Sequence, residues 1–210
     1  MKNFVVVLIA ALFSASLFDA LIAQTPDVIR DQRGYLTARV KKQVYPNGTY
    51  TFFSEVNYDY GSYIPPDPLN EAKVFVRSIW EFNIPTILPT GYYVKKVEIK
   101  YKGTSTTPFN LGYVSQYPSN PTLEQKWNLI ENSLFLKTLV GSNGTYYTYE
   151  IPELLEIIRS AHEQSIPKVY LSFKTSSELL NSTFNTFNDL VLIITYDIRQ
   201  VLCKKQLRCG

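Results

Sequence analysis

The sequence predicts an all-β fold: an antiparallel two-sheet β-sandwich of jelly-roll-like form, with one or two short helices. The 210 residues are rich in types that suit a pleated, half-buried surface, and Tyr occurs 16 times and Phe 12 times. About eight to ten short segments alternate between apolar and polar residues and are separated by turn signals. Long strand–helix–strand alternation is absent, which favours two packed antiparallel sheets over a parallel sheet.

The first 23 residues have the pattern of a secretory signal peptide. Lys2 gives a basic start, residues 4–18 form an almost unbroken apolar run, and Ala20 and Ala23 provide a small-residue exit. A run of about 15 residues is shorter than the roughly 20 that a spanning helix needs. We therefore predict cleavage after Ala23 and a secreted protein, either extracellular, at the cell surface or periplasmic, with no membrane span after cleavage. A buried N-terminal helix is the alternative.

The remaining chain is expected to form a single sandwich domain over residues 24–198, followed by a basic tail over 199–210. The formal net charge of +3 is too small to suggest nucleic acid or an anionic membrane as a partner. The tail holds both cysteines, Cys203 and Cys209. They form one disulfide in an oxidising compartment, pair with another chain, or are incidental to a loose tail.

The first expected element of the domain is a β-hairpin. Residues 24–34 read as an irregular lead-in, and strand-like runs at 35–45 and 49–58 then flank Asn47-Gly48. Asn-Gly is the strongest two-residue hairpin signal, because both central residues of a type I′ turn need positive φ. The Gly/Pro-rich segment 61–70 is expected to be a loop.

Two later segments show the alternation most clearly. Residues 72–84 place apolar side chains on one face, interrupted by Ser78, and Arg77, Glu81 and Asn83 on the other, with Ile79 among them. Residues 93–101 alternate in the same way, as a strand with one wet face does. We expect the apolar faces to meet between the sheets. They hold Val74, Val76, Trp80, Phe82 and Ile84 from the first segment and Val97, Ile99 and Tyr101 from the second.

Two helices are expected in the second half. An Asn120 cap followed by Pro121 predicts a helix over 121–131, and Pro152 opens an amphipathic helix over 152–164. The remaining strands are expected at 109–117, 134–140, 146–151, 169–174 and 190–198.

Three segments together resemble a known family. They are VFVRSIWEFNIPTILPTGYYVKKVEIKY (residues 74–101), YYTYEIPELLEIIRSAHE (146–163) and DLVLIITYDI (189–198). Their order is similar to that of secreted bacterial jelly-roll modules of the DNRLRE type, which are grouped with carbohydrate-binding domains. That family's first strand and turn are matched by Arg77, Phe82, Asn83 and Pro85, and its last strand by Tyr196. The resemblance covers residues 72–198, lacks the name-giving motif, and implies sugar binding without identifying a binding residue.

The sequence offers little for catalysis, and we predict that the protein is not an enzyme. His162 is the only imidazole and, late in a helix, is expected to be solvated or to compensate the helix dipole. Glu81 and Glu98 would resemble a glycosidase pair only if they faced one another on neighbouring strands, and both fall on expected solvent faces. No phosphate-binding loop, HExxH or EF-hand pattern is present.

No cofactor and no metal site is predicted. Asp27, Asp31 and Asp67 carry hard oxygen ligands of the kind that Ca²⁺ takes. Nothing in their spacing requires a calcium site.

Clusters of tyrosine are the best candidates for a binding site. Tyr58, Tyr60 and Tyr63 lie in or beside YDYGSYIPPDP, and Tyr92 and Tyr93 occupy another turn. A loop Tyr offers a flat apolar face and a hydroxyl, which suits stacking on a sugar ring or docking a protein. Tyr58 and Tyr60 share strand parity, so we expect them to form one platform. The alternative is that most of these rings cap the ends of the core. A third cluster holds Tyr146, Tyr147 and Tyr149.

Two functions fit these patterns. The first is a secreted, non-catalytic module that binds a carbohydrate or a cell-envelope partner through loop tyrosines. The second is a structural or adhesive surface protein without a small ligand, which associates with itself or through an exposed sheet edge. The identity of the ligand and the oligomeric state stay open, as does whether the chain is a truncated relative of a longer surface protein.

Overall fold

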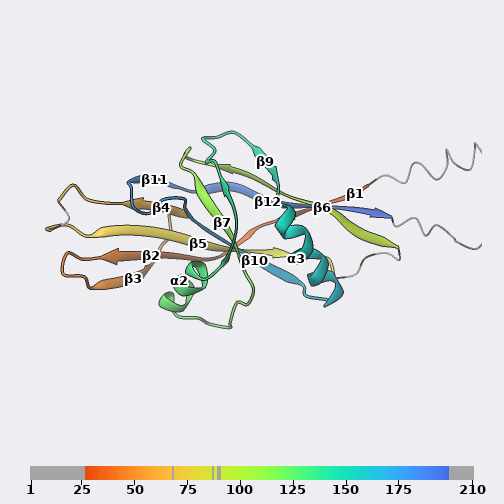
Figure 1. The fold of residues 1–210 in the computed structure, drawn as a ribbon, viewed down its shortest axis with the longest axis horizontal. Coiled ribbons are helices and arrows are strands. Elements are labelled where there is room, and N and C mark those ends of the chain that lie inside the picture. The colour runs from red at the N-terminus through yellow and green to blue at the C-terminus, as the bar shows by residue number, and fades with distance from the viewer. Residues whose placement is uncertain (1–26, 68, 87, 89–90, 199–210) are drawn as a thin grey trace, which may run out of the picture.

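The structure is a computed structural model that describes residues 27–67, 69–86, 88 and 91–198. The predicted leader (1–23) and the predicted tail with Cys203 and Cys209 lie outside the described residues. Within the described part, the chain forms two antiparallel sheets and two short helices (Figure 1). The predicted all-β, two-sheet class is confirmed.

The smaller sheet, called sheet A, has four strands in the order β1-β12-β6-β9. Its centre is the long antiparallel pair of β6 and β12. The expectation of an irregular lead-in over 24–34 is wrong, because β1 pairs with β12 over six residues. The strands are β1 (Val28–Arg33), β6 (Tyr92–Gly103), β9 (Tyr147–Glu150) and β12 (Phe187–Ile198).

The larger sheet, called sheet B, is organised around β5. Strand β2 pairs along one side of β5, and β4 and β10 follow one another along the other side. The order is β11-β4-β5-β10-β7-β8, with β3 joined to β2. The strands are β2 (Tyr35–Val44), β3 (Tyr50–Ser54), β4 (Tyr60–Tyr63), β5 (Lys73–Asn83), β7 (Phe109–Val114), β8 (Leu134–Leu139), β10 (Lys168–Thr175) and β11 (Ser182–Asn185).

The chain passes from sheet A to sheet B at Gly34, between β1 and β2. The Gly34 N–H donates to the Leu190 carbonyl at 2.8 Å. A Cβ at this position would lie 2.9 Å from the Phe82 ring, closer than packed carbon atoms approach. The absence of a side chain therefore lets the crossing strand lie directly on the core.

The main core lies between the two sheets, as the alternation of β5 and β6 predicts. Trp80, Phe82, Val97 and Ile99 are all at most 9% exposed and belong to one hydrophobic cluster. A group of touching aromatic rings occupies this cluster, with centroids 4.9–5.8 Å apart along the chain of contacts from Tyr60 through Phe109 and Phe173 to Phe187. Burial of these apolar faces is the main stabilising contribution to the fold.

The β2–β3 hairpin forms, but its turn differs from the predicted type. Tyr45 and Thr49 close a three-residue loop, and the Gly48 N–H donates to the Tyr45 carbonyl at 3.0 Å. Gly48 has a φ of +83°, whereas Asn47 is not among the described residues with positive φ. The expectation of a type I′ turn is therefore wrong. Pro46 fixes a φ that suits the first central position of a type I turn, and Gly48 then takes the left-handed position.

The two helices are α2 (Leu123–Glu131) and α3 (Pro152–Glu163). Thr122, rather than the expected Asn120, caps α2: its hydroxyl accepts from the Gln125 N–H, and the Gln125 side chain accepts from the Thr122 N–H. This reciprocal capping box satisfies two terminal donors, which is why the helix begins later than Pro121. Helix α3 begins at Pro152 as predicted.

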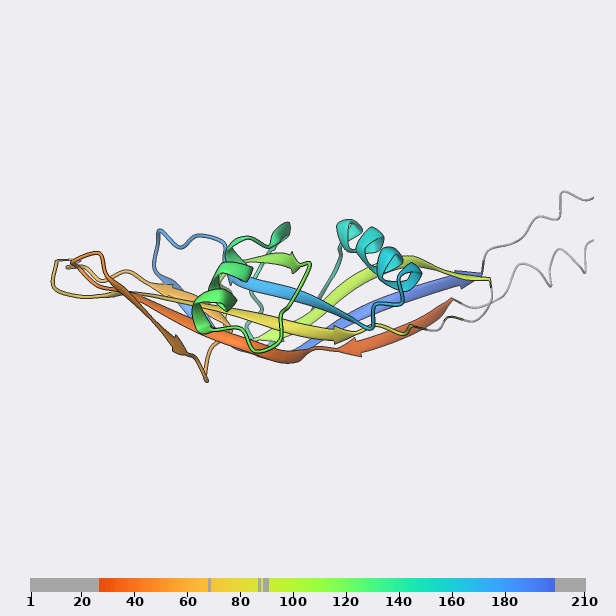
Figure 2. The same ribbon diagram turned by 90° about the horizontal axis from the view of Figure 1, so that it is seen from below.

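The helices cover different parts of the sheets and lie apart along the long axis of the molecule (Figure 2). Helix α3 packs against β6 and contributes Leu154, Ile158 and Ala161 to the main core. Helix α2 packs on the opposite face of β5, where Ile79 and Ile130 share a separate small cluster. The apolar Ile79 beside Arg77 and Glu81 on this face of β5 is thereby explained, because α2 covers it.

Candidate functional site: a cleft along helix α2

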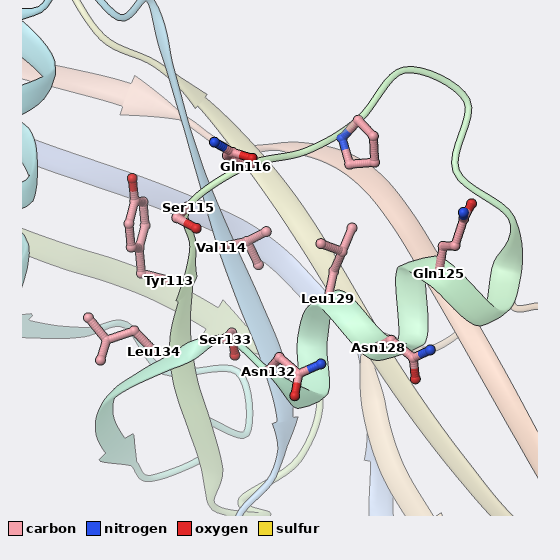
Figure 3. Close-up of a pocket in the computed structure, with 11 residues that line it drawn as sticks. Tyr113, Val114, Ser115, Gln116, Gln125, Asn128, Leu129, Asn132, Ser133 and Leu134 are labelled. Atoms are coloured by element: carbon pink, nitrogen blue, oxygen red, sulfur yellow. The ribbon is translucent and has the colours of Figure 1, made fainter.

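A cleft of about 670 Å³ lies beside α2. Figure 3 shows its walls, which come from the end of β7, the connection to α2, α2 itself and the start of β8. Four of its side chains are amides: Gln116, Gln125, Asn128 and Asn132. Its apolar surface comes from Tyr113, Val114, Pro118, Leu129 and Leu134, and Ser115 and Ser133 add hydroxyls.

Helical spacing brings the amides of α2 to the cleft. Gln125, Asn128 and Asn132 follow one another at intervals of three and four residues, which places them along one face of the helix. Trp127 and Ile130 lie on the buried face and anchor the helix to sheet B. The cleft therefore owes its polar wall to the side of α2 that the sheet does not cover.

The amides in the cleft are largely unused by the protein. Gln125 engages only its oxygen, in the capping box. The side chains of Gln116, Asn128 and Asn132 make no hydrogen bond to any residue that the structure describes. Each free amide presents two donors and one carbonyl acceptor in a plane. The cleft thus offers hydrogen-bonding capacity that is exposed and uncommitted.

The cleft is uncharged. Among the described residues that line it, none is Asp, Glu, Lys, Arg or His. Burial raises the pKa of the Tyr113 hydroxyl, so this group stays protonated at physiological pH. Neutral donors and acceptors beside apolar ring and branched side chains match a neutral, polyhydroxylated ligand better than they match an ion.

Tyr60 does not contribute to an exposed platform. It is fully buried, and its hydroxyl donates to the Thr107 carbonyl at 3.0 Å. Burial raises its pKa far above the ordinary range for tyrosine. The expectation that Tyr60 and Tyr58 form one platform is wrong, because β4 begins at Tyr60 and turns that ring into the core.

The other predicted tyrosines lie in separate places. Tyr58 stacks on Phe184 with ring centroids 5.1 Å apart, at a groove of about 350 Å³. Tyr63 donates to Glu71, and Tyr93 donates to Asp197 at 3.4 Å. Tyr92 packs against the main core. Strand β4 and the start of β6 lie toward opposite ends of the molecule (Figure 1), so the five tyrosines form no single flat patch.

His162 lies in the last turn of α3, as predicted, but it is half-buried rather than solvated. Its Nε2 lies 3.1 Å from the Tyr196 hydroxyl, and the two rings meet edge to face with centroids 5.6 Å apart. Burial lowers its pKa below the usual value for histidine. Its role is therefore to hold α3 on β12.

The two glutamates considered as a catalytic pair are separated. Glu81 lies on β5 of sheet B and pairs with Lys168 at 2.8 Å, whereas Glu98 lies on β6 of sheet A and pairs with Lys96 at 2.9 Å. They do not face one another on neighbouring strands. Each carboxylate is matched by a lysine on the surface instead.

The candidate calcium ligands do not gather. Asp27 pairs with Lys95, and Asp67 accepts from the Leu69 N–H in its own loop. Within the described ranges, no three acidic, histidine or cysteine side chains come close enough to hold a metal ion. In the same part of the chain, neither helix has the length and apolar character needed to cross a membrane.

Neither the chain nor the cleft can be assigned by sequence similarity to a known family or curated protein. No protein-family model matches the sequence, and no curated protein matches it. The resemblance of residues 72–198 to DNRLRE-type modules stays a prediction.

The residues of the cleft are absent from the candidates that the sequence suggests. Gln116 comes from a loop, Asn128 from α2 and Asn132 from the C-cap of α2, so no motif connects them. One feature of the sequence is related to the cleft: the apolar Ile79, which lies between Arg77 and Glu81 on one face of β5, indicates that another element covers this face. The helical stripe of Trp127 and Ile130 is the matching signal on α2.

Proposed function

We propose that this protein is a secreted, non-catalytic β-sandwich module that binds a neutral carbohydrate in the cleft beside α2. The observation that carries the proposal is the uncharged lining, in which uncommitted amides stand beside apolar side chains. A sugar presents vicinal hydroxyls at its edge, which suit planar amides, and apolar C–H groups on its faces, which suit the Tyr113 ring. The resemblance to DNRLRE-type modules, which are grouped with carbohydrate-binding domains, agrees with this class of ligand.

A glycan array with the mature protein tests the proposal, followed by calorimetric titration of the best oligosaccharide. We expect Asn128→Ala and Asn132→Ala to weaken binding by about tenfold each, because each removes a hydrogen-bonding group from the cleft. Asn188→Ala is the matched control. It removes an exposed asparagine on β12, away from α2, and should leave the affinity unchanged.

The same titrations separate the cleft from the tyrosines. Tyr63→Ala removes a half-exposed ring outside the cleft, and we expect it to have no effect on affinity. Loss of binding in Tyr63→Ala with full binding in Asn128→Ala would move the site to the loop tyrosines. Absence of any glycan ligand would remove the carbohydrate proposal.

One observation favours a second function, a structural or adhesive role through self-association. Strand β8 is an edge of sheet B, and it exposes Leu134 and Phe135 at 60% and 59%. An edge with unpaired backbone groups and exposed apolar side chains is suited to pair with another chain. Sedimentation velocity over a range of concentrations tests this. A dimer that Phe135→Lys dissociates would support it, and a monomer at the highest concentration would contradict it.

A further inference from the structure

A second cleft, of about 320 Å³, lies on the other side of α2, between this helix and the β2–β3 hairpin. Three aromatic side chains, here called the aromatic cage, converge in it: Tyr50 and Phe52 from β3 and Trp127 from α2. The ring centroids of Tyr50 and Phe52 are 5.3 Å apart, and those of Phe52 and Trp127 are 5.8 Å apart. Two elements distant in sequence therefore place their aromatic rings around one space.

The aromatic cage already holds a cation from the chain itself. The Lys42 Nζ lies 4.4 Å from the Tyr50 centroid, 5.5 Å from Trp127 and 5.6 Å from Phe52. All three distances fall within the range of cation–π attraction. A single ammonium is thus placed over three rings.

The ammonium of Lys42 is an imperfect occupant. It forms no ion pair and no hydrogen bond with any residue that the structure describes. The partly buried Lys42 ammonium carries three N–H donors, and the rings around it satisfy such donors only weakly. A methylated ammonium brings the same charge with no N–H donor, so it suits the aromatic cage better than lysine does.

The charges around the cage also favour an added cation. Glu124 lies beside it and accepts from the Tyr50 hydroxyl at 3.3 Å. Arg77 lies over the Trp127 ring at 3.7 Å and is neutralised by Glu131 and Glu178. Three carboxylates and two cations line the cleft, and Lys174 also pairs with Glu131 at 3.5 Å. Displacement of Lys42 would therefore leave three carboxylates against two cations, a net negative charge.

From this geometry we propose that the aromatic cage is a binding site for organic ammonium groups, and that Lys42 is a built-in competitor that occupies it in the free protein. A ligand of this class is a quaternary ammonium such as the choline headgroup. Binding would displace the flexible Lys42 side chain towards solvent. The proposal is independent of the neutral cleft, because the two sites use different rings and only Asn128 borders both.

Choline chloride is the probe, titrated while tryptophan fluorescence or NMR shifts are followed. Its neutral carbon isostere, 3,3-dimethyl-1-butanol, is the control ligand, because it has the same shape without the charge. We expect Lys42→Ala to bind choline at least fivefold more tightly than the natural chain, because the competitor is gone. Choline should bind more tightly than the isostere in both proteins.

A second variant tests the rings. In the Lys42→Ala background, Tyr50→Ala should weaken choline binding roughly three- to tenfold, the contribution of one cation–π contact. Tyr50 is 50% exposed, so the fold should survive its truncation. Tyr35→Ala is the matched control, because Tyr35 is 56% exposed on the same strand as Lys42 but outside the cleft.

Five outcomes decide the proposal. Choline binding at least fivefold tighter in Lys42→Ala than in the natural chain supports it, because it identifies Lys42 as the competitor, and equal binding in the two proteins contradicts that role. Equal binding of choline and of the isostere overturns it, because the cleft would then be merely apolar. Absence of choline binding in both proteins at tens of millimolar also overturns it. Equal losses in Tyr50→Ala and Tyr35→Ala would contradict the assignment to the aromatic cage.

Discussion

Helix α3 places Leu154, Ile158 and Ala161 in the main core, whereas α2 lies on the outer face of sheet B with Ile130 in a small cluster. Both helices are short and amphipathic. Helix α3 completes an existing core and borders none of the three clefts described above, whereas α2 separates an uncharged cleft from a charged one. The difference shows that a helix laid across the outer face of a sheet creates a cleft on each of its sides. Side chains that can bind a ligand line both clefts.

Because α3 lies in the main core and α2 on a small cluster, truncating an isoleucine on each helix should destabilise the protein to different extents. Ile158→Ala should lower the free energy of unfolding by about 4 kcal/mol, and Ile130→Ala by about 2 kcal/mol. Both side chains are fully buried, but Ile130 sits in a small cluster beside an open cleft, so its surroundings can relax. Urea denaturation measures both. Ile29→Ala, at an exposed position, should change stability by less than about 0.5 kcal/mol.

An equal loss in the two isoleucine variants would contradict this distinction. It would mean that α2 is as integral to the fold as α3 is. The clefts beside α2 would then be an incidental result of packing.

The next largest effect concerns the ion pairs under α2. Arg77→Ala should cost about 2 kcal/mol, because it removes the contact with Trp127 and leaves Glu131 and Glu178 without their partner. The two carboxylates keep contact with water, so the loss should be smaller than that for a fully buried pair. Urea denaturation measures this change as well. Arg77→Met, which keeps an apolar stem on the Trp127 ring, should cost about half as much.

If Arg77→Met and Arg77→Ala were equally destabilising, the charges alone would hold this region. If neither changed stability, the region would contribute only to binding. Among the described residues, the ion pair on α3 is the exposed one between Arg159 and Glu156, so the test is specific to α2.

Much of the fold follows from alternation along the chain. The segments that became β5 and β6 show an apolar face in sequence, and Trp80 and Val97 are buried where that pattern places them. Strand β1 could not be predicted in this way. Its sequence, VIRDQR, has one apolar and two polar residues on each face and so shows no alternation, and the register of this edge strand comes from pairing with β12.

The candidate site could be predicted from the sequence less well than the fold could. Loop tyrosines are common binding residues, but Tyr60 is a core residue. Its inward direction follows from the pairing of β4 with β5, which the sequence does not show. The amides of the cleft are ordinary surface residues until α2 docks. A helical stripe predicts that α2 has a buried face, but it does not say which face of which sheet receives it.

The two helices also begin differently, which predicts a smaller effect. Thr122→Ala should cost about 1 kcal/mol, because it removes half of the capping box of α2. Helix α3 has no comparable dependence, since its N-cap Ile151 is buried and makes no side-chain hydrogen bond. Hydrogen exchange should show faster opening at the start of α2 alone. Ser119→Ala, at an exposed position before the cap, is the control and should have no measurable effect on exchange. Faster exchange in both helices would contradict a local role.

The smallest predicted effect is that the two helices lose stability in different pH ranges. Burial lowers the folded-state pKa of His162 on α3, so the unfolded chain takes up the proton first as pH falls. The stability due to neutral His162 is therefore complete above about pH 6.5 and declines below it. At Glu131 on α2, burial alone would raise the pKa, but Arg77 and Lys174 lower it, so that contribution is lost only at more acidic pH, below the ordinary value of 4.5.

Unfolding free energies of the natural chain and of His162→Phe, measured at pH 8 and pH 5.5, test this separation. The natural chain should lose more stability over this interval than the variant does, because His162 is the sole histidine. Hydrogen exchange should locate the loss in α3 and leave α2 unchanged. Parallel losses in the two proteins would mean that the contact of His162 with Tyr196 does not depend on the protonation of the imidazole. In that case pH would not distinguish the helix that completes the core from the helix that forms the clefts.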